Sequence, residues 1–346
     1  MQPSSFGLRL HRCVVAAVLM GVAALCSAAT IHWTGEGGDG SWHTAANWRE
    51  ADGNGDFDAA GTQRTPTTGD TVAIDDGDAN TTTTVLYSQA VTLDIDGVES
   101  AETLRITAGA IDFGGGASVG DAGGLIELAG GSISIANGGS MLIDMTVTAG
   151  SFAAGNSVTI SGDLVVQGGS VALSNGATLS GSVLLQGGSL SLAIGTTLSG
   201  TMTVESGDLS LSNNADITGS VVIEGGNVSL DTNGEVSEFA VSGGSLTLTN
   251  NADVGEFTMT GGDVTLGNGA NVTSLSITGG SITFEGTATL ADVSVDGGAL
   301  TFQGDAAISG TMTVTDGSVT VEGGGSLDAA SLSISGGTFS VAVGAT

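Results

Sequence analysis

The stretch Ser245-Leu-Thr-Leu-Thr-Asn-Asn-Ala-Asp-Val-Gly-Glu-Phe-Thr-Met-Thr-Gly-Gly262 holds one complete structural repeat of this chain. Its apolar positions are Leu246, Leu248, Val254, Phe257 and Met259. Apolar residues that alternate with polar ones at a step of two are typical of short β-strands with one buried face. The pattern restarts with Val264, 18 residues after Leu246. This stretch therefore predicts short strands joined by tight turns, with no amphipathic helix.

A pair of small residues, usually Gly-Gly, recurs at intervals of 18 to 20 residues. The clearest pairs begin at Gly168, Gly187, Gly225, Gly243, Gly261, Gly279, Gly297 and Gly336, with degenerate copies at Ser206 and Asp316. A fixed period near twenty indicates a solenoid. We expect these first glycines to hold a corner at positive φ, which glycine adopts without a Cβ clash. A second corner is expected at Asn175, Asn213, Asn233, Asn250, Asn268 and Gly286.

Three strands and three corners per repeat predict an all-β fold, a three-sided parallel β-helix over residues 104–346 with about thirteen coils of 18–20 residues. Each column of the repeat would then stack on itself along the axis. The apolar steps of 2, 6, 3, 2 and 5 residues differ from the six-residue step of left-handed hexapeptide helices. The spacing therefore favours a right-handed helix.

Residues 1–29 have the features of a secretory signal peptide. Arg9 and Arg12 precede an apolar run from Val14 to Leu25, and small residues end the segment before Thr30. The apolar run is too short for a membrane-spanning helix. Both cysteines of the chain, Cys13 and Cys26, lie in this segment, so we expect an exported protein without disulfides.

The charge is strongly one-sided. The chain has 36 acidic residues, five arginines and no lysine, a net charge of −31. Removal of Arg9 and Arg12 with the leader would leave 36 acids against three arginines, or −33, and no basic residue follows Arg105. A surface of this kind repels nucleic acids and anionic membranes, which we exclude as partners. The charge suits a protein that stays soluble outside the cell.

Residues 30–103 differ from the repeats and hold all three tryptophans, Trp33, Trp42 and Trp48. We interpret this segment as an N-terminal cap with the first irregular coils, because bulky aromatic residues can cover the open edge of a solenoid. A sugar-binding aromatic platform is the alternative.

One acidic cluster suggests a calcium loop. Asp52, Asn54, Asp56 and Asp58 place oxygen ligands at alternate positions, as calcium loops do. Phe57 stands where such a loop needs glycine, and Gln63 replaces the bidentate glutamate. A solvated polar loop is therefore the alternative, and no other cofactor is expected.

The opening W-x-G-x-G-x-x-x-x-W-x-x-x-x-N-W, followed by Gly-Asp-Thr-Val-x-Ile, resembles the start of bacterial exported repeat proteins of the autotransporter passenger type. The Gly-Gly coils resemble the passengers of self-associating autotransporter adhesins. The resemblance implies a right-handed β-helix displayed at the bacterial cell surface, associated with the outer membrane, that mediates adhesion or self-association. The residues up to Thr346 do not include the family's C-terminal translocator barrel and end within a coil, so we expect either a fragment of a longer protein or a resemblance that concerns the solenoid only.

We therefore expect an exported, non-catalytic surface rod that is structural, adhesive or self-associating, with a second copy or a cell-surface glycan or protein as its partner. The alternative is a polysaccharide-acting β-helix enzyme. A carboxylate-based glycoside hydrolase would use two acids, and Glu205 and Glu224 share one column in successive coils. Gln167 and Gln186 occupy the same column, however, which is typical of a solvated edge.

Overall fold

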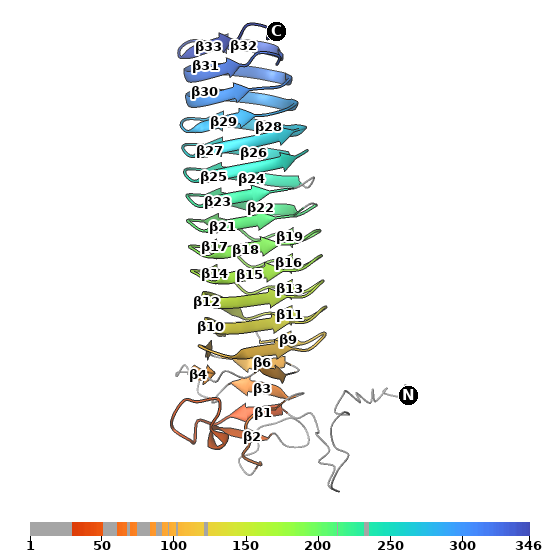
Figure 1. Cartoon of the computed structure of the whole chain (residues 1–346), viewed down its shortest axis with the longest axis vertical. Coiled ribbons are helices and arrows are strands. Elements are labelled where there is room, and N and C mark those ends of the chain that lie inside the picture. The colour runs from red at the N-terminus through yellow and green to blue at the C-terminus, as the bar shows by residue number, and fades with distance from the viewer. Residues whose placement is uncertain are drawn as a thin grey trace, which may run out of the picture.

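The computed structural model is a rod of stacked β-coils (Figure 1). It describes residues 30–50, 61–67, 70–74, 84–87, 92–95, 97–101, 103–120, 124–212, 214–231 and 235–346. The chain forms a parallel β-solenoid of about 12 turns with almost no helix. In the described ranges the one helical element is the 3-10 turn η1 (Ala45–Asn47). The predicted all-β, parallel β-helix is confirmed.

Three faces run along the rod. The first face contains β4 (Thr84–Tyr87), β7 (Thr103–Ile106), β14 (Leu164–Val166), β17 (Val183–Leu185) and β20 (Met202–Val204). The second contains β5 (Thr92–Ile95), β8 (Ala110–Phe113), β15 (Ser170–Leu173), β18 (Ser189–Leu192), β21 (Asp208–Leu211), β23 (Asn227–Leu230), β25 (Ser245–Asn250), β27 (Asp263–Asn268), β29 (Ser281–Phe284) and β33 (Thr338–Val341). The third contains β3 (Thr71–Ile74), β6 (Gly97–Ala101), β9 (Ser118–Val119), β11 (Ser140–Met141), β13 (Thr159–Ile160), β16 (Thr178–Leu179) and β19 (Thr197–Leu198).

Other strands continue around a corner and belong to more than one face. Two join the first and second faces: β10 (Leu125–Ile135) and β12 (Asp144–Ala154). Five join the third and first: β22 (Asp216–Ile223), β24 (Glu235–Val241), β26 (Asp253–Met259), β28 (Ala270–Ile277) and β32 (Leu327–Ile334). Two follow all three faces: β30 (Ala288–Phe302) and β31 (Ala306–Val321). Strands of 15 and 16 residues are longer than the sequence predicts, because pairing with the coil below continues through the corners with only local register shifts.

In each column of the repeat, a residue of one coil stacks on the equivalent residue of the next coil, as predicted. Along the first face, twelve successive parallel pairings link thirteen described strands from β7 to β32. Phe239 lies opposite Phe257 in this register, and their rings are 5.6 Å apart. A residue therefore has its nearest non-bonded neighbours about 19 positions away, and the core is a series of like-on-like stacks.

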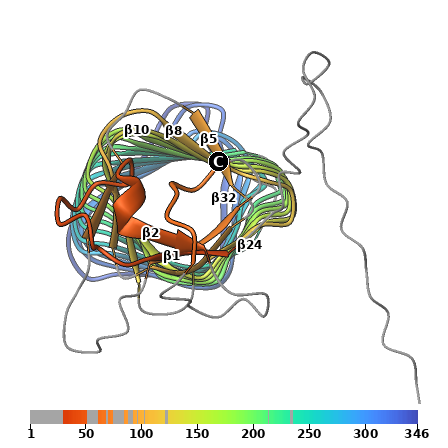
Figure 2. The ribbon, with the colours of Figure 1, turned by 90° about the horizontal axis from the view of Figure 1, so that it is seen from below.

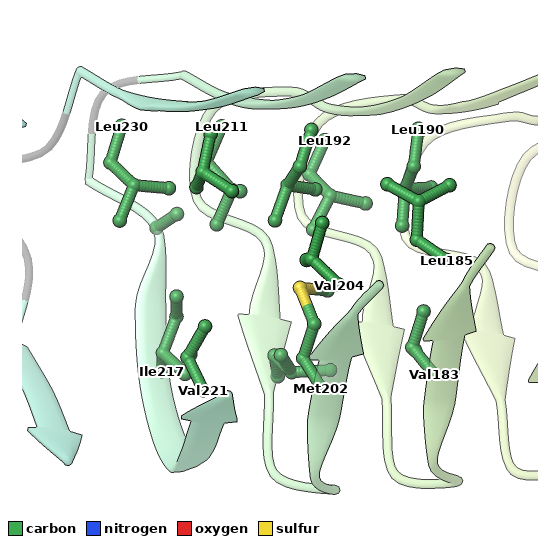
Figure 3. Close-up of a cluster of buried hydrophobic side chains, with 14 of the residues drawn as sticks. Val183, Leu185, Leu190, Leu192, Met202, Val204, Leu211, Ile217, Val221 and Leu230 are labelled. Atoms are coloured by element: carbon green, nitrogen blue, oxygen red, sulfur yellow. The ribbon is translucent and has the colours of Figure 1, made fainter. Parts of the chain in front are cut away.

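The predicted inward positions are buried. Leu246, Leu248, Val254, Phe257 and Met259 are each 0–1% exposed. Figure 3 shows the same columns in other coils, with a row of leucines on one face opposite valine, isoleucine and methionine on the others. Burial of apolar area at about 25 cal/mol per Å² is the main stabilising contribution in such an interior.

The interior contains one more column that the sequence template lacks. At the corner before the third face, small residues are buried against the core; they are Ala117, Val158, Ala177, Thr196, Ala215, Ala252, Ala270, Ala288 and Ala306. Thr196 fits among them because its hydroxyl donates to the carbonyl of Ala193 at 2.7 Å. Alternating polarity does not reveal this column, since alanine occurs on both buried and exposed surfaces.

Residues 30–50 lie at the N-terminal end of the rod (Figure 2). Strand β1 (Thr30–Trp33) pairs in parallel with β3 and antiparallel with β2 (Trp48–Glu50). Trp33, Trp42 and Trp48 are at most 3% exposed, and Trp48 meets the other two edge to face at centroid distances of 4.9 and 4.7 Å. The indole N–H of Trp48 donates to the carbonyl of Trp42 at 2.7 Å. No indole is left open to stack on a sugar.

Two residues of the opening motif, the Asn before Trp48 and the Asp of Gly-Asp-Thr-Val, are buried polar groups with several hydrogen bonds. Asn47 is fully buried; its amide nitrogen donates to Asp39 at 2.6 Å, and its oxygen accepts from the Gly37 N–H at 2.7 Å. Asp70, 1% exposed, accepts two hydrogen bonds from Arg64 at 2.6 and 2.9 Å. That contact raises the pKa of Arg64. The two residues of the motif thus hold their neighbouring loops through hydrogen bonds.

The corner glycines need one correction. Among Gly168, Gly187, Gly225, Gly243, Gly261, Gly279 and Gly297, Gly297 alone has a positive φ. The left-handed residue is the second of each pair, for example Gly169 at 70° and Gly244 at 70°. The first glycine is needed for a different reason: a Cβ on Gly243 would lie 2.3 Å from the carbonyl oxygen of Glu224 in the coil below.

The second corner shows the same shift by one residue. Positive φ falls on Gly176, Asn214, Asn251 and Gly269, each directly after a position that the sequence suggested. Asn213 and Asn233 themselves lie outside the described residues. Asn250 and Asn268 are paired across adjacent coils instead. In both corners the left-handed residue is therefore the second of the pair, whereas at Gly286 neither that residue nor Thr287 has a positive φ.

Candidate interaction surface

Two outward columns cover the first face of the rod, and their side chains are short. In the coils from β14 to β20 these columns contain Asp163, Ser182 and Thr201, followed two residues later by Val165, Leu184 and Thr203. Val165, Leu184 and Thr203 are half-buried, whereas Ser182 and Thr201 are exposed. Because one side of each strand forms the core, these alternate residues point outward. The first face is thus a flat surface of short hydroxyl-bearing and aliphatic side chains.

Two shallow grooves lie on this face at equivalent positions. One, of about 360 Å³, is lined by Asp163, Leu164, Val165, Ser182, Val183, Leu184, Thr201 and Thr203. The other, of about 210 Å³, lies six coils further on and is lined by Ser274, Leu275, Ser276, Asp292, Val293, Ser294, Thr311 and Thr313. The same columns line both grooves, so the grooves are a consequence of the repeat.

The acid of each groove is engaged in the same way. The Asp163 carboxylate accepts from the backbone N–H of Ser182 at 2.7 Å, and Asp292 accepts from that of Thr311 at 2.9 Å. Each carboxylate thus binds the backbone of the next coil, 19 residues further along the chain. These two aspartates have a structural role in joining coils.

The column of Glu205 and Glu224 forms the rim next to the Gly-Gly corner. The Gln167 amide donates to Gln186 at 3.2 Å, and the Gln186 amide donates to Glu205 at 3.0 Å. Gln167, Glu205 and Glu224 are exposed. Side chains from successive coils therefore form a hydrogen-bonded ladder on the surface, as the solvated-edge interpretation expects.

The predicted calcium loop of Asp52, Asn54, Asp56 and Asp58 lies outside the described residues. In the part of the chain that the structure describes, no group of three or more His, Cys, Asp or Glu residues is placed to hold a metal ion. The same part contains no helix long and apolar enough to cross a membrane.

The fold and this surface define the molecule as a three-sided parallel β-solenoid with repetitive polar faces. No protein-family model, curated protein or solved structure matches the chain. Function is therefore inferred from the rod itself.

Proposed function

We propose that the chain is an exported, non-catalytic rod of the bacterial cell surface that acts through adhesion or self-association. The observation that carries this proposal is the recurrence of one shallow groove in the same columns, six coils apart. A site that recurs along a rod can give tight attachment through many weak contacts, because linked contacts raise the effective concentration of each further one. The predicted signal peptide and the resemblance to autotransporter passengers support export to the outer surface.

The charge predicts how such attachment depends on ionic strength. Each rod carries 36 acids against three arginines after loss of the leader. Repulsion between rods is screened within about 10 Å at 0.1 M salt, so self-association should strengthen as salt or calcium is added. Purified residues 30–346 coupled to beads, with aggregation followed by light scattering across a salt series and a calcium series, test this. Aggregation that is strongest at low salt would contradict the proposal.

The alternative enzyme is tested with the same protein. We expect no turnover of neutral or acidic glycans, because Glu205 is tied into a surface ladder with Gln186. Reducing-end release from a glycan set is the measurement, and Glu205→Gln is the informative variant. Turnover that disappears in Glu205→Gln would contradict the adhesive role and show that the chain is a carboxylate-based hydrolase.

A further inference from the structure

The acidic charge is unevenly distributed along the rod. Residues 164–204, the neutral segment, contain no Asp, Glu, Lys, Arg or His. Between Glu205 and Asp328 there are seventeen acids and no basic residue. The neutral segment comprises β14 to β20, which are paired in parallel on all three faces. One part of the surface therefore lacks the repulsion that dominates the rest.

The larger groove of the first face lies in this neutral segment. Leu184 and Val165, both half-buried, form its aliphatic part, and Ser182, Thr201 and Thr203 add hydroxyl groups. Asp163 stands at its edge, where its carboxylate accepts from the Ser182 N–H. The equivalent groove further on has serines in place of Val165 and Leu184, and it has Asp292 within it. The two grooves thus differ in apolar surface and in charge while sharing one backbone.

We infer that the groove around Leu184 is the site where two copies of this chain meet, related by a twofold axis near Leu184. The inference rests on the proposed self-association and specifies its location. An isologous contact of this kind places the same patch of both copies face to face. Neutral side chains would then meet neutral side chains, and Leu184 would meet its own counterpart.

The charge on both sides of the neutral segment favours this location. Residues 205–328 carry seventeen acids and no basic residue, and residues 30–163 carry nineteen acids and three arginines. A contact centred elsewhere on the rod would place acids of one copy against acids of the other. A contact centred on the neutral segment therefore has the least repulsion.

The size of the groove predicts a weak contact. Three coils at about 4.8 Å each span roughly 14 Å of the rod. A stable dimer buries about 800 Å² on each partner, more than such a patch offers. The pair would therefore be transient in solution and effective where many rods are held on one surface. A glycan is a poorer fit, since the residues that line this groove include no aromatic side chain on which a sugar ring could stack.

Cysteine cross-linking tests the location. Residues 30–346 contain no cysteine and include all described strands, so one introduced cysteine reports one position. Under mild oxidation at moderate salt, Leu184→Cys should give several-fold more disulfide-linked dimer than Ser276→Cys, a half-buried position in the same column of the acidic segment. Equal yields from the two variants would overturn the inference.

A charge variant separates this inference from the proposed function. Leu184→Glu should abolish bead aggregation, and Thr258→Glu, in the same column of the acidic segment, should leave most of it. Circular dichroism melts of both variants verify the fold. Aggregation that survives Leu184→Glu keeps the adhesive rod but refutes this site; no aggregation of the unaltered protein at any salt concentration refutes both. Inhibition of aggregation by a neutral glycan at low concentration would reassign the groove to that glycan.

Discussion

At the scale of single residues, the corners show two different requirements for glycine within one dipeptide. Gly244 is at φ 70°, a region that L-residues rarely adopt. Gly243 has an ordinary conformation, but a side chain there approaches the backbone of the coil below. Ser206 shows that the first position can accept a side chain, because its hydroxyl donates to the Gln186 carbonyl of the preceding coil. At the second position every described pair has glycine, including Gly207 after Ser206.

This difference gives an order of stabilities. Gly244→Ser should lower the free energy of unfolding by about 1–3 kcal/mol more than Gly243→Ser, because serine at positive φ is strained whatever space surrounds it. Urea unfolding followed by circular dichroism is the measurement. A larger loss for Gly243→Ser would mean that contact with the Glu224 carbonyl, and not backbone conformation, governs the corner.

At the scale of elements, the N-terminal segment depends on a buried ion pair. Arg64 contacts Asp70 through both terminal nitrogens, and the Asp70 carboxylate also accepts from the backbone N–H of Thr67 at 2.7 Å. Asp70 immediately precedes β3, the strand on which β1 lies. Arg105 offers a contrast, because its contact with Glu127 is 3.6 Å long and both side chains are at least 36% exposed.

Removal of the arginine should therefore lower the stability of the cap at the Arg64–Asp70 pair and have little effect at the Arg105–Glu127 pair. Arg64→Ala leaves the buried Asp70 carboxylate without its cation and should destabilise the cap by about 2–4 kcal/mol, somewhat less than a fully buried pair because Arg64 is partly exposed. Arg105→Ala, the matched control, should cost about 0–1 kcal/mol. Tryptophan fluorescence reports on the cap, since Trp33, Trp42 and Trp48 all lie in it. Equal fluorescence midpoints for the two variants would contradict this assignment.

At the scale of the whole molecule, stability is a sum over neighbouring coils, because each coil contacts mainly the coil before it and the coil after it. The acids of residues 205–328 repel one another along the rod, whereas the neutral segment has no such repulsion. Stability should therefore vary along the axis in a manner that salt can change.

Hydrogen exchange would resolve this variation. Raising the salt concentration should increase amide protection in residues 205–328 and leave residues 164–204 nearly unchanged, since screening acts on charge alone. An uncharged osmolyte is the control and should raise protection in both segments. A salt effect of equal size in the two segments would show that repulsion within the rod is negligible.

The sequence by itself determined the architecture and most of the core. Leu246, Leu248, Val254, Phe257 and Met259 identify the buried columns because alternation in polarity is local information, and a fixed period near nineteen has few structural solutions. The calcium loop and the function remain predictions, since neither follows from that periodicity.

The tertiary structure decided what depends on the distance between coils. It assigned positive φ to Gly244 and not to Gly243, placed Ala252 inside, and carried β30 and β31 around their corners. It also placed Val165, Leu184 and Thr203 together in one groove. The physical reason is common to all of these: a corner or a groove is set by contact with residues about 19 positions away, and hydropathy within one repeat does not encode that contact.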